Sequence, residues 1–272
     1  MVELFERDVK DEFTSSKGNQ LKWKNGDFWY KTDYAGYEGL AEFACSKILE
    51  LSSLNEDEYL KYETEKIKYK STVFLGCRSK NLLKPGWQLI TLERLIKMKT
   101  GQSIGASIYR LESYEDRLRF LEREAVRATG IEDFGLYLSK MITLDCFFLN
   151  EDRHTHNIAV LQDEEGKIHP CPYFDQGASL LSDTTMDYPM GEDIYKLIKA
   201  ARSKTFCTDF DDALETADKL YGVNLRFSFG YMDMAKAIDS ENNYPPEVKE
   251  RVKAILAEQR RRYGYLFRDS LK

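Results

Sequence analysis

The chain has 272 residues, of which 42% are hydrophobic and 13% aromatic. This composition is too apolar for an intrinsically disordered chain, and the length allows one large domain or two lobes. The 40 basic and 46 acidic residues give a formal net charge of -6, which argues against a surface that coats nucleic acid. The five scattered cysteines form no C-x-x-C pair, which favours a reducing compartment over a disulfide framework or structural zinc.

The sequence also argues against a membrane location. The N-terminal segment, MVELFERDVKDEF, is charged throughout and lacks the apolar core of a signal peptide. No apolar run approaches the ~18 residues of a membrane span. We therefore expect a soluble, cytoplasmic protein that binds neither a membrane nor nucleic acid directly.

A polar loop and a hairpin are expected first. Residues 14–20, TSSKGNQ, are small and polar, and the backbone N–H groups of such a loop can cradle phosphates. The next stretch, QLKWK-NG-DFWYK, predicts a β-hairpin over residues 20–31, because Asn25-Gly26 favours a type I′ turn in which both residues have positive φ. Lys31 stands at the end of the second strand, from which its charge can reach a cleft.

A helix is predicted next, over residues 37–51, from apolar residues that repeat at helical spacing. Glu38 and Glu42 lie four residues apart on one face of it, so either acid can pair with a nearby lysine. Extended segments follow at residues 59–77, expected as two strands, and at residues 87–92.

Helices dominate the rest of the chain. A capping box at Ser113 and Asp116 and a closing Gly130 predict one helix. Further helices are expected over residues 131–148, 193–201, 208–221 and 246–267. This order predicts an α+β chain with a β-rich first lobe and one main helix over residues 1–92, and a mostly helical second lobe over residues 93–272.

The densest group of chemically useful residues lies between Asn150 and Gly177. Asp152 and Asn157 share one loop, and a buried strand, a turn at residues 163–166 and a second extended segment bring Asp175 back towards them. In phosphoryl transfer a loop Asp can accept the hydroxyl proton, while an Asn and a second Asp hold Mg²⁺. Each residue alone is typical of a turn, but the order D-R-H-x-x-N, strand, D-x-G favours a phosphotransferase.

A strand lysine and a helix acid form the second candidate group. Lys31 can neutralise the phosphates of ATP if an acid on the following helix holds it in place. Glu42 is the preferred partner and Glu38 the rival. The G-x-G-x-x-G loop of eukaryotic-type protein kinases is absent from the sequence.

All three histidines fall within or beside the same loop. The spacing His154-x-His156 allows a metal pair, but no Cys or third ligand stands at zinc-site spacing. We expect His154 to support the catalytic loop through hydrogen bonds, and His156 and His169 to be surface or packing residues.

These residues resemble those of a known family. The motif Asn150-x-Asp152-Arg153-His154-x-x-Asn157, followed by Phe174-Asp175, resembles the HipA-like serine/threonine kinases of bacterial toxin–antitoxin systems. Gly18-x-Gln20-x-Lys22 is similar to the tail of that family's phosphate-binding loop. The stretch from Glu42 to Leu49 is similar to its first-lobe helix, and Thr91-Leu-Glu93-Arg94 to its interlobe hinge.

The resemblance implies a bilobal protein-kinase-like fold and a reaction that uses ATP and Mg²⁺. It implies Asp152 as catalytic base with His154 beside it, Asn157 and Asp175 as Mg²⁺ ligands, and Lys31 as the lysine that contacts phosphate.

It further implies that the nucleotide is contacted by Ser15, Ser16 and Gly18 of the phosphate loop, by the Lys31–Glu42 pair, and by Glu93 of the hinge. Autophosphorylation at Thr14, Ser15 or Ser16 and a small helix-turn-helix antitoxin partner are also expected.

Two alternatives to a protein kinase remain. A D-R-H-x-x-N loop followed by D-x-G also resembles the phosphatidylinositol 3/4-kinases, which would make the substrate a lipid or small molecule. A nucleotide-binding pseudokinase that acts through protein contacts is the other alternative, although such proteins usually lose one of the four residues Lys31, Asp152, Asn157 and Asp175.

Overall fold

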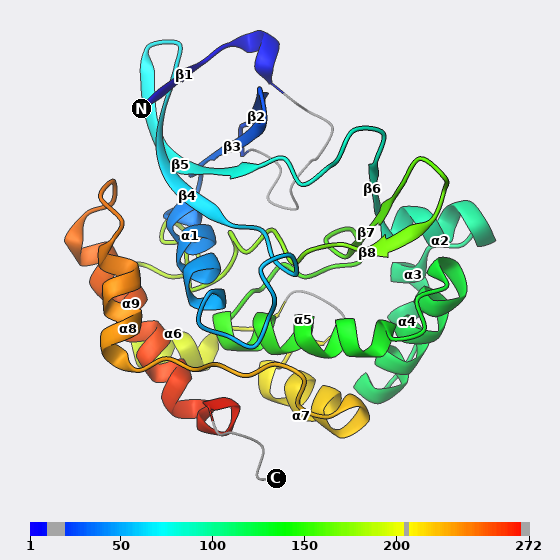
Figure 1. Ribbon diagram of the computed structural model, residues 1–272. Coiled ribbons are helices and arrows are strands. Elements are labelled where there is room, and N and C mark those ends of the chain that lie inside the picture. Colours follow the sequence, from blue (N-terminus) through cyan, green and yellow to red (C-terminus); the bar gives the residue numbers. More distant parts are fainter. Residues whose placement is uncertain (10–19, 204–206, 268–272) are drawn as a thin grey trace. The chain divides into compact units, whose positions relative to one another are not determined.

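The computed structural model describes residues 1–9, 20–203 and 207–267 (Figure 1). The chain separates into two compact units. The first unit comprises Met1–Leu82, Phe174–Ala201 and Phe227–Lys272, and the second comprises Leu83–Tyr173 and Arg202–Arg226. These units are interleaved along the chain. The division into a first lobe of residues 1–92 and a second lobe of residues 93–272 remains a prediction.

A five-stranded sheet with the order β1-β4-β5-β3-β2 forms part of the first unit. Its strands are β1 (Val2–Leu4), β2 (Lys22–Asn25), β3 (Phe28–Thr32), β4 (Tyr62–Tyr69) and β5 (Thr72–Lys80). Pairing is antiparallel except between β1 and β4, which run parallel. The two strands predicted within residues 59–77 are therefore confirmed as β4 and β5.

The β2–β3 hairpin is confirmed, but its predicted type I′ turn is wrong. Asn25 pairs with Phe28, so Gly26 and Asp27 are the two loop residues. Gly26 has a φ of 58°, and Asp27 is not among the residues with positive φ. A glycine at the first loop position with an ordinary second residue is the other common hairpin solution, in which only the glycine needs positive φ.

One face of this sheet carries a small apolar core. The buried side chains of Leu4, Trp23, Tyr30 and Ile67 pack together there. Because side chains alternate along a strand, the same alternation that buries Trp23 directs Lys22 to the opposite face of the sheet.

Helix α1 (Glu38–Leu49) packs against β4 and β5 of this sheet (Figure 1). Almost all of its side chains are buried. Its start is fixed by two acids: the Glu38 carboxylate accepts hydrogen bonds from the backbone of residues 34–36, and Asp33 accepts one from Gly39 at 2.7 Å. Carboxylates at this end satisfy backbone N–H groups that have no partner within the helix.

The remaining helices of the first unit come from late segments of the chain. They are α6 (Ile194–Ala200), α8 (Tyr231–Asp239) and α9 (Pro246–Arg262), with 3₁₀ turns at Glu6–Asp8 and Gly264–Phe267. The single helix expected over residues 246–267 is thus wrong in its length, since α9 ends at Arg262 and a 3₁₀ turn follows. Helix α8 was not expected from the sequence pattern.

The second unit combines a short sheet with helices. Its three strands pair in the order β6-β7-β8, and all its pairs are antiparallel. The elements are β6 (Gln88–Thr91), α2 (Leu92–Thr100), α3 (Ile104–Ile108), α4 (Tyr114–Thr129), α5 (Phe134–Phe148), β7 (Ala159–Gln162), β8 (Ile168–Pro170) and α7 (Phe210–Tyr221). The strand expected at residues 87–92 therefore joins the hairpin that follows the loop of residues 150–157, and not the five-stranded sheet.

Helices α4 and α5 position the loop that follows them. Ser113 accepts a hydrogen bond from the Asp116 backbone at 3.0 Å, and Gly130 ends α4 with a φ of 75°, which confirms both residues as caps. The predicted capping box is wrong in its second bond, because the Asp116 carboxylate accepts from the Ser113 hydroxyl at 2.7 Å. Helix α5 is buried along most of its length and ends at Leu149, whose φ of 57° turns the chain sharply into the loop.

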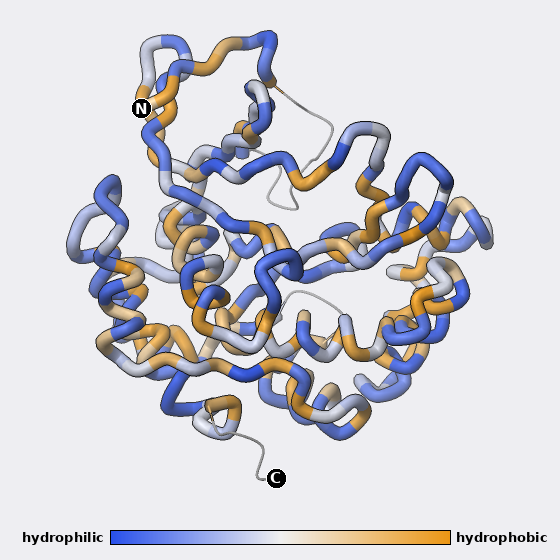
Figure 2. Tube along the Cα trace, viewed as in Figure 1, coloured by the Kyte–Doolittle hydropathy of each residue, from blue (hydrophilic) through white to orange (hydrophobic). Residues whose placement is uncertain are grey.

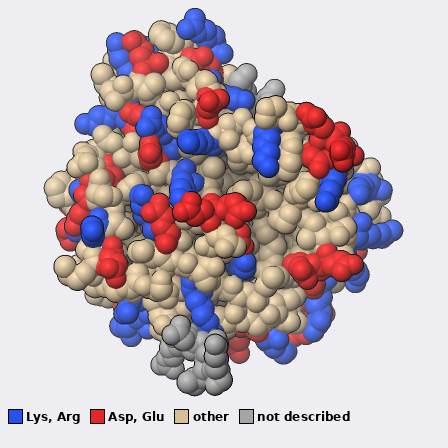
Figure 3. Space-filling view, in the orientation of Figure 1, with Lys and Arg blue, Asp and Glu red and all other residues tan. Residues whose placement is uncertain are grey.

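Hydrophilic and hydrophobic stretches alternate along much of the chain (Figure 2). Among the described residues, no helix is both long and apolar enough to cross a membrane. On the face drawn in Figure 3, basic and acidic side chains are interspersed, as the nearly balanced composition leads us to expect.

Candidate active site

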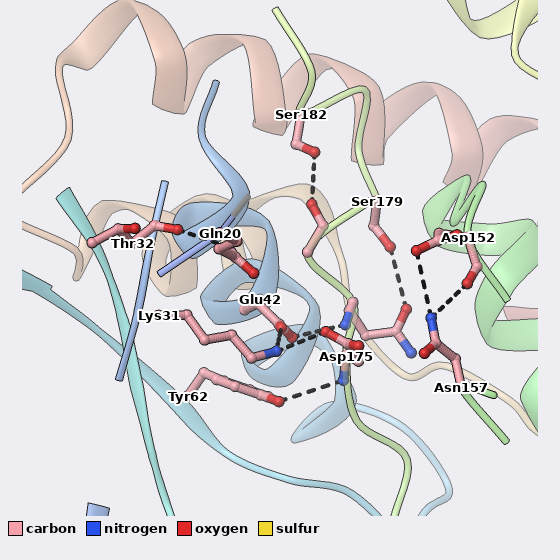
Figure 4. A network of polar contacts seen from close by, with 12 residues as sticks. Gln20, Lys31, Thr32, Glu42, Tyr62, Asp152, Asn157, Asp175, Ser179 and Ser182 are labelled. Carbon is pink, nitrogen blue, oxygen red and sulfur yellow. Dashed lines mark hydrogen bonds and ion pairs between the residues drawn. The ribbon is translucent and has the colours of Figure 1, made fainter. Parts of the chain in front are cut away.

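The first unit holds a partly buried cluster of one lysine and two acids (Figure 4). The Nζ atom of Lys31, on β3, lies 2.7 Å from Glu42 Oε1, on α1, and 2.7 Å from Asp175 Oδ1. The Glu42 side chain is only 1% exposed, and those of Lys31 and Asp175 are 15% and 23% exposed. Glu42, and not Glu38, is therefore the partner of Lys31.

The charges of this cluster depend on one another. Burial by itself lowers the pKa of Lys31, but Asp175 and Glu42 outweigh it and raise that pKa well above its ordinary value. Burial raises the pKa of Glu42, and the Lys31 ammonium opposes that shift. The lysine is thus held fully charged, with more negative than positive charge around it.

Backbone contacts fix the segment that carries Asp175. Asp175 has a φ of 62°, a left-handed conformation that is uncommon for residues other than glycine and clusters at functional sites. The Asp175 N–H points to the Tyr62 hydroxyl at 3.4 Å, and the Gln176 N–H donates to Glu42 Oε2 at 2.8 Å. Glu42 therefore orients both Lys31 and the D-x-G segment.

Lys22 belongs beside this cluster, although the sequence reasoning gave it no role of its own. It pairs with Lys31 across the β2–β3 hairpin, and cross-strand partners point to the same face. Its side chain is only 9% exposed and has no hydrogen-bond or ion-pair partner among the described residues. Burial lowers the pKa of Lys22, and Asp175 partly offsets this. The hairpin register was the signal that could have revealed a second lysine here.

The second unit holds the loop that carries Asp152. The loop is anchored by a buried ion pair between Arg153 Nε and Asp145 Oδ2, at 3.0 Å, which the sequence reasoning missed. Asn150 donates from its side chain to Asp145 Oδ1 at 2.9 Å. Burial raises the pKa of Asp145, while Arg153 acts in the opposite direction. Asp145 lies on α5, so this helix sets the position of the loop.

Asp152 and Asn157 lie together within this loop (Figure 4). The Asn157 side-chain N–H₂ donates to the Asp152 carbonyl at 2.8 Å and lies 3.5 Å from Asp152 Oδ2. The amide nitrogen of Asn157 thus faces Asp152, which leaves the amide oxygen as its possible ligand atom. Arg153 Nη1 donates to the Asn157 carbonyl at 2.9 Å and so braces both ends of the loop.

The three histidines have separate environments. His154 Nε2 lies 3.7 Å from Asp152 Oδ1, and its Nδ1 accepts a hydrogen bond from the His156 backbone at 3.2 Å. His169 stacks on Trp87 with ring centroids 4.8 Å apart and contacts Asp163 at 2.7 Å. Among the described residues, no three His, Cys, Asp or Glu side chains gather as a metal site.

Glu93 was predicted as a hinge residue in contact with the nucleotide, and that role remains a prediction. The structure places it in the first turn of α2, buried, with Oε2 accepting from Gly105 N at 2.9 Å and Thr155 Oγ1 at 3.0 Å. Burial raises its pKa, but these donors and Ser103 outweigh it and lower the pKa below its ordinary value. The predicted phosphate-loop residues Ser15, Ser16 and Gly18 lie outside the described residues, as does Thr14.

Comparison with known proteins supports the fold. No family model and no curated protein matches the sequence. Among solved structures, the chain is similar to the crystal structure of the Helicobacter pylori proinflammatory kinase CtkA, with a TM-score of 0.62 and 15% sequence identity, over 96% of this chain and 94% of that chain. The predicted α+β, protein-kinase-like fold is thereby confirmed. Membership of the HipA-like family remains a prediction.

Proposed function

We propose that the protein is an ATP-dependent phosphotransferase that moves the γ-phosphoryl group of Mg-ATP to a serine or threonine hydroxyl of a protein. The observation that carries this proposal is the buried Lys31–Glu42 pair, with Asp175 on the same ammonium at 2.7 Å, in a chain with a kinase-like fold. A lysine held charged by a helix acid is the arrangement by which kinases neutralise nucleotide phosphates.

Two lysines of the first unit supply positive charge for the phosphates. Lys31 stays protonated because two carboxylates surround it. Lys22 brings a second ammonium to the same face of the sheet, and among the described residues no ion pair is formed with it, although Asp175 acts on it from nearby. A buried cation without a counter-ion raises the free energy of the folded protein. A phosphate group that binds beside it therefore gains more binding free energy than it would beside an exposed lysine.

The residues predicted to hold the metal ion have suitable chemistry. Asp175 offers a carboxylate and Asn157 an amide oxygen that faces away from Asp152. Oxygen atoms of this kind are the ligands that Mg²⁺ prefers, and one or two carboxylates plus phosphate oxygens usually suffice. When bound, the ion would neutralise charge on the transferring phosphoryl group.

Asp152 is the residue proposed to receive the proton of the acceptor hydroxyl. Its side chain is 21% exposed, so a substrate hydroxyl can reach it. Asn157 and the Arg153–Asp145 pair fix the loop on either side, and His154 lies 3.7 Å from the carboxylate. A carboxylate held in this way orients the hydroxyl and removes its proton as the new phosphate ester bond forms.

The test is transfer of label from radiolabelled Mg-ATP to proteins in a cell lysate. We expect labelled serine or threonine with the wild-type protein, and a loss of at least about a hundredfold with Asp152→Ala. Asp163→Ala, which removes an acid from the turn between β7 and β8, is the control and keeps the activity. Label in inositol lipids alone would indicate a lipid kinase, and no difference between wild type and Asp152→Ala would contradict the proposal.

A partner protein is a further part of the proposal. The resemblance to HipA-like kinases leads us to propose a small helix-turn-helix antitoxin as a binding partner, and autophosphorylation within residues 14–16 as a means of control. Co-purification of the protein with the product of a neighbouring gene tests the first, and phosphosite mapping after incubation with Mg-ATP tests the second.

A further inference from the structure

A small cavity lies within the second unit, beside the loop that carries Asp152. Its volume is about 220 Å³. Its walls come from Glu93 at the start of α2, from Ser103, Gly105, Ile108 and Tyr109 at α3, and from residues 154–156 of the loop. Pockets for drug-sized ligands measure roughly 300–1,000 Å³, so this cavity suits a single side chain or a similarly small group.

The charge of the walls favours a cation. Glu93 is ionised, because its hydrogen-bond donors outweigh burial and lower its pKa. Neither Lys nor Arg is among the residues that line the cavity, and the charged group that acts on Glu93 is the His156 ring. Tyr109 forms part of the wall, and the faces of tyrosine rings attract ammonium and guanidinium groups.

The walls also suit an aliphatic stem that leads to such a cation. Ile108 is buried and presents an apolar surface, and Tyr109 is 56% exposed at the same cavity. Lysine and arginine side chains lay their methylene groups along apolar surface and direct the charged end to a polar partner. The Thr155 hydroxyl, in the same wall, donates to the Glu93 carboxylate and so helps to fix its position.

We propose that this cavity binds a lysine or arginine side chain of the protein substrate, close in sequence to the hydroxyl that is phosphorylated. The inference rests on the proposed function. The cavity wall begins two residues after Asp152, and His154 both lines it and lies 3.7 Å from the Asp152 carboxylate. A side chain held here therefore brings its neighbours in the substrate to the proposed base.

The first experiment measures binding and needs no catalysis. N-acetyl-arginine methylamide and its lysine counterpart are titrated into the isotope-labelled full chain, with the uncharged norleucine analogue as control, and chemical shifts are followed. We expect the charged probes alone to shift the resonances of residues 93, 103–109 and 154–156. Binding to Glu93→Gln should be at least about tenfold weaker, because one hydrogen bond to a charged group is lost. Equal shifts with norleucine, or none at these residues, would overturn the inference.

The second experiment measures specificity with serine and threonine peptide libraries in which each flanking position is varied. We expect Lys or Arg to be selected at one position, and this preference to fall at least about tenfold in Glu93→Gln. Tyr109→Ala should also weaken this preference, and it provides a second test if Glu93→Gln does not fold. Tyr231→Ala on α8, which is 55% exposed, is the matched control.

The outcomes separate this inference from the proposed function. Phosphorylated peptides without a basic preference would overturn the inference and leave the kinase function standing. A raised KM for ATP in Glu93→Gln with unchanged peptide preference would also overturn it, because Glu93 would then serve the nucleotide. Absence of any transfer, with the charged probes still bound, would refute the kinase function and with it the substrate role of the cavity.

Discussion

Replacement of Asp33 by asparagine should change how stability depends on pH. Asp33 lies just before α1, where it accepts hydrogen bonds from Gly39 N and from the Tyr244 hydroxyl, each at 2.7 Å. Burial raises its pKa from 3.8 to about 7, and these two donors only partly oppose the shift. Glu38, a second acid at the start of α1, adds to the rise.

The sign and size of the effect follow from linkage between protonation and folding. A carboxyl whose pKa is higher in the folded state contributes stability that is fully present below 3.8 and is lost as pH rises to about 7. The loss is about 1.4 kcal/mol per pH unit, or on the order of 3 kcal/mol between pH 5 and pH 8. Asparagine cannot ionise, and its amide can replace both hydrogen bonds. The Asp33→Asn variant should therefore gain stability relative to wild type as pH rises.

The assay is urea unfolding at several pH values, followed by the fluorescence of the three tryptophans, Trp23 and Trp29 in the first unit and Trp87 in the second. We expect the difference in unfolding free energy between Asp33→Asn and wild type to grow by about 3 kcal/mol from pH 5 to pH 8. Glu56→Gln, at a side chain that is 87% exposed, controls for the loss of one formal charge. A difference that stays constant over this range would refute the reasoning.

Three further changes have definite expected results. Asp145→Asn leaves the buried Arg153 guanidinium without its counter-charge and should lower the free energy of unfolding in urea by about 3–5 kcal/mol. An unchanged urea midpoint would show that the pair does not hold the loop. Gly76→Ala places a Cβ atom 2.0 Å from the Lys31 carbonyl oxygen, and should destabilise by about 1–3 kcal/mol and weaken ATP binding in calorimetry. Glu42→Gln removes a charged hydrogen bond from Lys31 and should lower kcat/KM for ATP at least about tenfold; wild-type kinetics would contradict its role.

Elements that depend on local sequence were predictable. The β2–β3 hairpin, α1, and α4 with its Ser113 and Gly130 caps all follow from patterns within a few residues. The central loop was recognisable for the same reason, because Asp152 and Asn157 are five residues apart and their contact is local.

Features that depend on long-range contacts were not predictable. Strand β6 looks like any other short strand, and only its pairing with β7 assigns it to the second sheet. The Arg153–Asp145 pair joins the loop to helix α5, and the sequence does not show which side of this helix faces the loop. Asp145 therefore looks like one polar residue in a largely apolar helix. Lys22 was named only as part of the phosphate-loop resemblance; the hairpin register places it beside Lys31, but that this face meets the acids of α1 and of the Asp175 segment depends on long-range packing.

Phosphoryl transfer from ATP to protein hydroxyls is tested by site-resolved mass spectrometry. The purified protein, Mg²⁺ and γ-labelled ATP are first incubated with a lysate in which endogenous kinases have been inactivated. We expect labelled phosphate on serine or threonine residues, dependent on Mg²⁺ and reduced at least about a hundredfold by Asp152→Ala in a folded protein. Equal labelling by wild type and Asp152→Ala, or no labelling by a folded wild-type protein that binds ATP, would contradict this expectation.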